Sequence, residues 1–100
     1  MAKECNAEIF REELPYFRSV CLDVSETGAV KVDAQDMGEL VKEIWKDSDY
    51  EFWVEVPSSE VQKLLFALLK EKYEGRRGAV DEFTSFCKAH NIKHAWDSWA

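Results

Sequence analysis

The chain has 100 residues and a mass of 11.6 kDa, which suits one small domain with a single core. Hydrophobic residues make up 46% of the chain and aromatic residues 13%, a composition that excludes disorder for most of it. No apolar run approaches the roughly 20 residues that cross a bilayer, so neither a transmembrane helix nor a membrane partner is expected. Residues 1–13 hold no apolar stretch typical of a signal peptide, which predicts a cytoplasmic protein.

The formal net charge is −7 and the pI is about 4.8. Residues 1–60 hold six basic and fifteen acidic side chains, whereas residues 61–100 hold seven basic and five acidic ones. Nucleic acid is not an expected partner, because phosphate binding requires a basic surface. The three cysteines, Cys5, Cys21 and Cys87, are widely spaced and odd in number, which is typical of small apolar side chains rather than a disulfide framework.

The first half of the chain predicts a short helix and then a hairpin. Within residues 1–15, Ala7, Phe10 and Leu14 have helical spacing, and Pro15 would end that helix. Residues 17–24 alternate apolar and polar side chains, as a strand with one buried face does. Residues 25–28 predict a turn with Gly28 in the left-handed region, and residues 29–34 predict the returning strand.

A helix is expected next, over residues 36–47. Asp36 and Glu39 have the spacing of a capping box, in which each side chain satisfies a free amide at the helix start. An apolar stripe follows at helical spacing: Met37, Leu40, Val41, Ile44 and Trp45. Residues 50–56 then predict a strand rich in aromatic and β-branched side chains. Because a helix would connect this strand to the one before it, we expect the two strands to run parallel.

The second half predicts two helices and a last strand. Residues 60–74 carry a stripe of leucines and end at Gly75, while residues 79–90 carry a second stripe and end near Asn91. Residues 92–99 alternate as a strand does. The order β-β-α-β-α-α-β, with the short N-terminal helix before it, predicts a single α+β domain over residues 1–100. Its architecture would be a two-layer sandwich with a four-stranded mixed sheet and helices on one face.

The strand phases place large aromatic side chains among carboxylates on the sheet face away from the helices. This set is Glu51, Trp53, Glu55, Asp97 and Trp99, with Asp23 and Asp33 beside it. Exposed tryptophan is typical of protein interfaces, and acidic rims accelerate association. We therefore expect a small interaction module of the inhibitor, immunity or adaptor type, which binds a protein partner or a second copy of itself. The alternative is that the two indoles pack flat on neighbouring strands or are covered by the N-terminal segment.

Two other sites stay open as a rival hypothesis, a protein that binds a small ligand, an anion or a metal. Cys87, His90 and His94, with Asp97 as a fourth ligand, have the chemistry of a zinc site but lack the second ligand pair usual in such sites. Arg76 and Arg77 precede a predicted helix and could hold a phosphate or carboxylate there. For both sets the favoured interpretation is structural, as packed or solvated side chains. No cofactor is expected, and an enzyme is less favoured because the chain shows no convincing acid–base pair.

Overall fold

The computed structural model describes residues 5–37 and 49–99, which form four strands followed by two helices. The strands are β1 (Asn6–Glu12), β2 (Phe17–Val24), β3 (Val30–Met37) and β4 (Asp49–Val56), and the helices are α2 (Ser58–Tyr73) and α3 (Ala79–Ala89). The chain divides into two compact units, Met1–Leu64 and Leu65–Ala100, with the boundary inside α2. The first unit holds the sheet, and the second holds the end of α2 together with α3.

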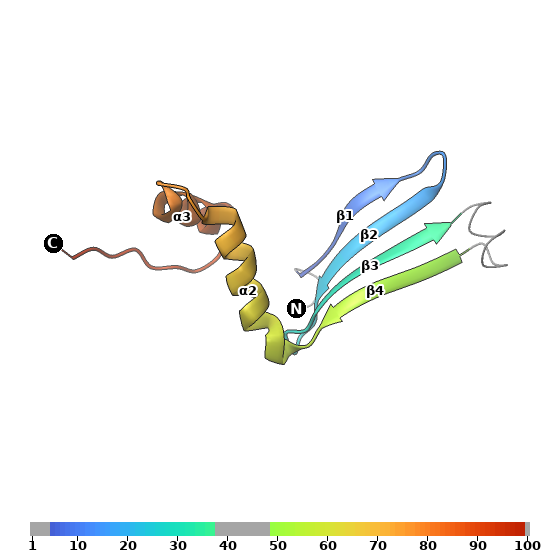
Figure 1. Ribbon diagram of the computed structural model, residues 1–100, viewed down its shortest axis with the longest axis horizontal. Coiled ribbons are helices and arrows are strands. Elements are labelled where there is room, and N and C mark those ends of the chain that lie inside the picture. Colours follow the sequence, from blue (N-terminus) through green and yellow to red (C-terminus); the bar gives the residue numbers. More distant parts are fainter. Residues whose placement is uncertain (1–4, 38–48, 100) are drawn as a thin grey trace. The chain divides into compact units, whose positions relative to one another are not determined.

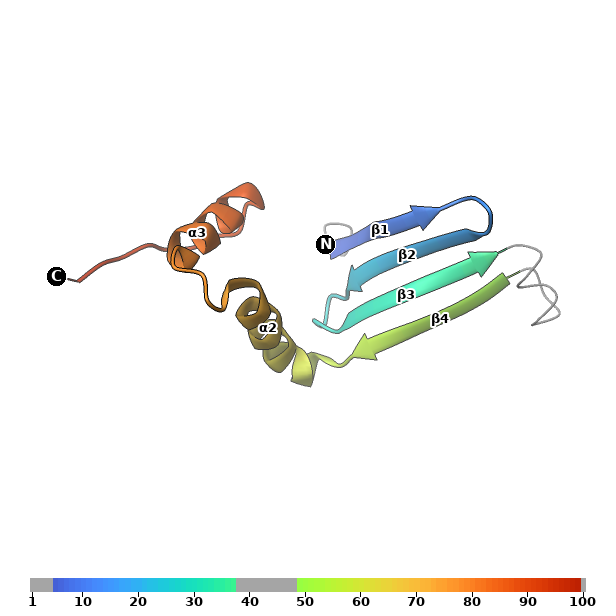
Figure 2. The same cartoon turned by 45° about the horizontal axis from the view of Figure 1, so that its top comes forward.

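The four strands lie side by side in chain order, β1-β2-β3-β4, and every neighbouring pair is antiparallel (Figures 1 and 2). The connections from β1 to β2 and from β2 to β3 are short, and adjacent strands joined by a tight turn must reverse direction. The loop between β2 and β3 is closed by the amide of Gly28, which donates to the Ser25 carbonyl at 2.9 Å. Gly28 has a φ of 93°, so the predicted left-handed turn is confirmed.

The predicted mixed sheet and the element order β-β-α-β-α-α-β are wrong. β3 and β4 pair antiparallel in unbroken register, from Val30 opposite Val56 to Met37 opposite Asp49. β3 continues through Asp36, where we expected the helix of residues 36–47 to begin. The Asp36 carboxylate accepts two hydrogen bonds of 2.6 Å from the Arg18 guanidinium on β2, so it stabilises the sheet instead. Residues 38–47 of that predicted helix lie outside the described residues.

The predicted N-terminal helix is also wrong, because Asn6–Glu12 forms β1. A β-bulge between Glu8 and Phe10 explains the misleading pattern. Ala7 lies opposite Leu22 and Phe10 lies opposite Val20, so three residues of β1 span two of β2. The extra residue places Ala7 and Phe10 on one face at a spacing of three, which resembles helical periodicity.

The last predicted strand is absent, since residues 92–99 have no regular secondary structure and are exposed. α3 ends as expected, with Asn91 in the left-handed region at a φ of 57°. An alternating pattern shows only that a segment suits a half-buried strand; a strand also needs a neighbour to complete its hydrogen bonds. Within the part of the chain that the structure describes, no strand pairs with these residues.

Pairing across the sheet separates two faces of opposite character. The apolar face carries Ala7, Phe10, Val20, Leu22, Val24, Val30, Val32, Ala34, Phe52, Val54 and Val56. The polar face carries three rows, which are Asn6, Asp23, Lys31 and Glu55; Glu8, Cys21, Asp33 and Trp53; and Arg11, Ser19, Gln35 and Glu51. The strand phases therefore agree with the prediction for β2, β3 and β4. The predicted helical layer over one face stays a prediction, because α3 and most of α2 belong to the second unit.

Candidate protein-interaction surface

Trp53 is the largest side chain on the polar face, and it lies on β4, at one edge of the described sheet. The Trp53 side chain is 59% exposed. The residue opposite Trp53 is Asp33, which is too short to cover an indole ring. Most of the Trp53 side chain is therefore accessible to another molecule on this face of the sheet.

One cation and several carboxylates surround this indole. The Lys31 Nζ lies 5.8 Å from the centroid of the Trp53 ring, within the range of a cation–π contact. Glu51 and Glu55 precede and follow Trp53 by two residues on the same face, and Glu55 lies opposite Lys31. Both glutamates are exposed. The surroundings of Trp53 are therefore predominantly acidic, with one lysine positioned beside the ring.

The structure brings together only part of the predicted interaction set. Glu51, Trp53 and Glu55 share β4 and the polar face, and Asp23 and Asp33 occupy the same face on β2 and β3. The remaining two residues, Asp97 and Trp99, follow α3 in the second unit and do not belong to the sheet. Trp99 is 99% exposed, and the Asp97 carboxylate accepts a hydrogen bond of 2.7 Å from the Ser98 amide.

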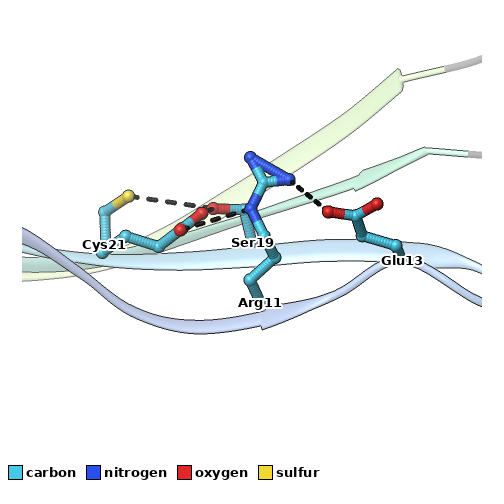
Figure 3. Close-up of polar contacts among 5 residues, drawn as sticks. Arg11, Glu13, Ser19 and Cys21 are labelled. Atoms are coloured by element: carbon cyan, nitrogen blue, oxygen red, sulfur yellow. Dashed lines mark hydrogen bonds and ion pairs between the residues drawn. The ribbon is translucent and has the colours of Figure 1, made fainter.

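A polar cluster at the other side of the polar face was missed by the sequence analysis. The Ser19 hydroxyl donates to one Glu8 carboxylate oxygen, and the Arg11 Nε donates to the other at 3.3 Å. Figure 3 shows Arg11 also pairing with Glu13, with 3.5 Å between Nη1 and Oε2, and Cys21 beside Ser19. Glu8 and Ser19 lie on different strands, so local sequence patterns contain no signal of their contact.

The contacts of this cluster link two strands of the sheet. The hydrogen bond from Ser19, supported by the charge of Arg11, lowers the pKa of the Glu8 carboxyl. The contact joins the bulged β1 strand to β2.

The residues of the hypothetical zinc site make separate contacts. Cys87 is 3% exposed within α3, the His90 ring lies 4.3 Å from the Phe86 ring, and His94 Nδ1 bonds the Ile92 carbonyl at 2.8 Å. Among residues 5–37 and 49–99, no group of three His, Cys, Asp or Glu side chains is placed to hold a metal ion. The structure thus gives the zinc hypothesis no geometric support.

The two arginines of the hypothetical anion site differ in their ion pairs. Arg76 donates to both carboxylate oxygens of Glu82, at 2.6 Å from Nε and 3.1 Å from Nη2. This pair lowers the pKa of Glu82 and raises the pKa of Arg76. An anion at Arg76 would have to displace the Glu82 carboxylate, which already forms a bidentate ion pair. Arg77 forms no ion pair with any described residue.

An apolar groove of about 440 Å³ lies on the helical unit. It is lined by Phe66, Leu69, Lys70, Tyr73, Ala79, Val80 and Phe83. The Tyr73 and Phe83 rings meet edge to face, with centroids 5.8 Å apart, and join α2 to α3. The sequence predicts Phe66 and Val80 as members of the apolar stripes of these helices, yet Phe66 remains 69% exposed and Val80 67%.

None of the described helices is sufficiently long and apolar to cross a membrane. Comparisons with protein-family models, with curated proteins and with solved structures find no match for this chain.

Proposed function

We propose that this chain is a small protein-interaction module and that its binding surface is the polar face of the sheet around Trp53. The observation that carries the proposal is the 59% exposure of an indole flanked by Glu51 and Glu55 on a regular strand. Large aromatic anchors dominate the affinity of protein interfaces, whereas surrounding charges mainly set the association rate and the choice of partner. This combination of one anchor and an acidic rim suits a partner with a basic surface.

The rigid position of the anchor supports this function. β4 is held by eight consecutive register pairs with β3, and Lys31 contacts the Trp53 ring from the neighbouring strand. An anchor that is already ordered loses little conformational entropy when it binds, so more of the contact energy appears as affinity. A tryptophan on a mobile loop would lack this advantage.

The test compares Trp53→Ala with Tyr16→Ala, which removes another exposed aromatic ring from the loop between β1 and β2. The unmodified chain first serves as bait, and the proteins that it retains are identified and purified. Calorimetry then measures the binding of each purified partner to the unmodified chain and to both variants. We expect Trp53→Ala to weaken binding of the purified partner by about 2 kcal/mol or more, the range of an interface anchor. Tyr16→Ala should bind as the unmodified chain does.

Circular dichroism of both variants separates binding from folding. Truncation of a buried tryptophan to alanine costs about 3–5 kcal/mol of unfolding free energy. Because the Trp53 ring is mostly exposed, its removal should cost far less. A melting transition that collapses in Trp53→Ala would show a core residue and would contradict the proposal. Equal binding by Trp53→Ala and the unmodified chain would contradict it as well.

A further inference from the structure

The two edges of the described sheet differ in their capacity to accept another strand. β1 forms one edge and is interrupted by the bulge between Glu8 and Phe10, a feature that disrupts the hydrogen-bonding ladder. β4 forms the other edge, and its register with β3 is unbroken over Asp49–Val56. Among residues 5–37 and 49–99 no further strand pairs with the outer side of β4, so amide and carbonyl groups within Glu51–Val56 are placed where an added strand could bond them.

β4 also lacks most of the devices that protect sheet edges. Between Asp49 and Val56 it contains no proline, no lysine and no bulge, and Pro57 comes only after the strand has ended. Its side chains are accessible on both faces, since Trp53 is 59% exposed on the polar face and Val54 is 71% exposed on the apolar face. Among the residues of β4 itself, the protecting feature that remains is the charge of Glu51 and Glu55.

That charge disfavours a second copy of the chain as the added strand. If two β4 strands paired antiparallel about Trp53, Glu51 of each copy would face Glu55 of the other. Like charges directly opposite each other on neighbouring strands are destabilising. The same two carboxylates favour a strand that presents lysine or arginine at alternate positions.

We propose that a segment of the protein partner adds to β4 as a fifth strand, and that this segment is an extended basic peptide. Its lysine or arginine side chains lie on the polar face opposite Glu51 and Glu55, and its intervening apolar side chains lie on the apolar face beside Phe52 and Val54. The ladder supplies affinity, and the alternation of charge supplies selectivity. The inference rests on the proposed function, because it names the partner chemistry of the same surface.

The experiment uses the full chain and an eight-residue probe peptide that alternates lysine and valine, at pH 7 and low salt. Amide hydrogen exchange is followed residue by residue by NMR. We expect the peptide to slow exchange at alternate residues of β4 and to leave β1 unchanged. The same peptide N-methylated at every residue keeps its charge but donates no backbone hydrogen bond, so it should bind at least tenfold more weakly.

Charge selectivity is tested with a matched peptide and a matched pair of variants. A peptide that alternates glutamate and valine should bind at least tenfold more weakly than the lysine peptide. The double substitution Glu51→Gln/Glu55→Gln should reduce this preference severalfold, whereas Glu12→Gln/Glu13→Gln, which removes the same charge at the end of β1 and in the loop after it, should preserve it. Unchanged β4 exchange, equal slowing of β1, equal binding of the two peptides or a dimer with protected β4 amides would each overturn the inference.

The outcomes distinguish this inference from the proposed function. If Trp53→Ala abolishes binding of the cellular partner while the lysine peptide leaves β4 exchange unchanged, the polar face is a binding surface and strand addition is wrong. If the peptide protects β4 while Trp53→Ala binds the cellular partner normally, strand addition is supported and the polar face is not the functional surface.

Discussion

Charged side chains at the surface of this protein form specific ion pairs that alter the pKa of their partners. Arg76 and Glu82 illustrate this in the helical unit, where the guanidinium reaches across the turn before α3 to both oxygens of one carboxylate. The hydrogen bond from Arg76 is the main cause of the lowered pKa of Glu82, ahead of the charge itself. The pair is exposed, so salt and solvent screen it, but its effect on protonation is directly measurable.

The pH dependence of this pair has a defined sign. The pKa of Glu82 in the folded protein lies below the ordinary value of 4.5, so between these two values the unfolded chain binds more protons. The stabilisation is therefore present above pH 4.5 and is lost as the pH falls through the folded pKa. We expect a carbon-detected NMR titration of the Glu82 carboxyl to have its midpoint below 4.5, and Arg76→Gln to move it towards 4.5.

Arg77→Gln is the matched control for this titration, because it removes the same charge from the neighbouring position. It should leave the Glu82 midpoint close to that of the unmodified protein. A shift as large as that of Arg76→Gln would mean that diffuse charge, rather than the direct contact, lowers the pKa.

At the scale of an element, the turn between β2 and β3 depends on the backbone freedom of glycine. Gly28 has a φ of 93°, a region that side chains with a Cβ atom rarely adopt. A Cβ built at this position would meet only the Ser58 Cβ at 3.7 Å, which is an ordinary contact. Any cost of substitution at Gly28 therefore comes from the backbone and not from crowding.

Gly28→Ala should consequently lower the unfolding free energy of the sheet by about 1–2 kcal/mol, the cost of the left-handed region for a residue with a side chain. Gly78→Ala is the comparison, because Gly78 has a φ of −93° and its Cβ would lie 3.5 Å from a Glu82 oxygen. That variant should change stability far less. Denaturant unfolding followed by circular dichroism measures both, and equal losses would refute the backbone explanation.

At the scale of the whole molecule, net charge and strand-edge chemistry act together. The net charge of −7 favours mutual repulsion at neutral pH, and repulsion disappears near the pI of about 4.8. Glu51 and Glu55 add a local barrier to pairing of two β4 edges, because like charges on neighbouring strands are destabilising. Self-association should therefore be weak at pH 7 and increase as the pH approaches 4.8.

Sedimentation velocity over this pH range tests the prediction with the same glutamine variants. Glu51→Gln/Glu55→Gln should begin to self-associate at a higher pH than the unmodified chain. Glu12→Gln/Glu13→Gln, with the same net charge, should show a smaller shift. Equal shifts would mean that net charge alone controls association and that the β4 edge has no special part in it.

What the sequence determined by itself is local. The alternation in β2 and β4, the helix α2 and the left-handed positions Gly28 and Asn91 depend on neighbours within a few residues, and the structure shows each of them. The polar face of β4, with Glu51, Trp53 and Glu55, was predictable for the same reason: a strand places alternate residues on opposite faces whichever strand it pairs with.

Only the tertiary structure decided which segments pair and in which direction. Asp36 lies in β3, paired with Arg18 on β2 and with Tyr50 on β4, although its local spacing predicted a helix cap. Asn6–Glu12 is a bulged strand because β2 completes its hydrogen bonds, and residues 92–99 alternate although none of the four described strands pairs with them. A strand is completed by hydrogen bonds to a segment distant in sequence, and no local pattern specifies that segment.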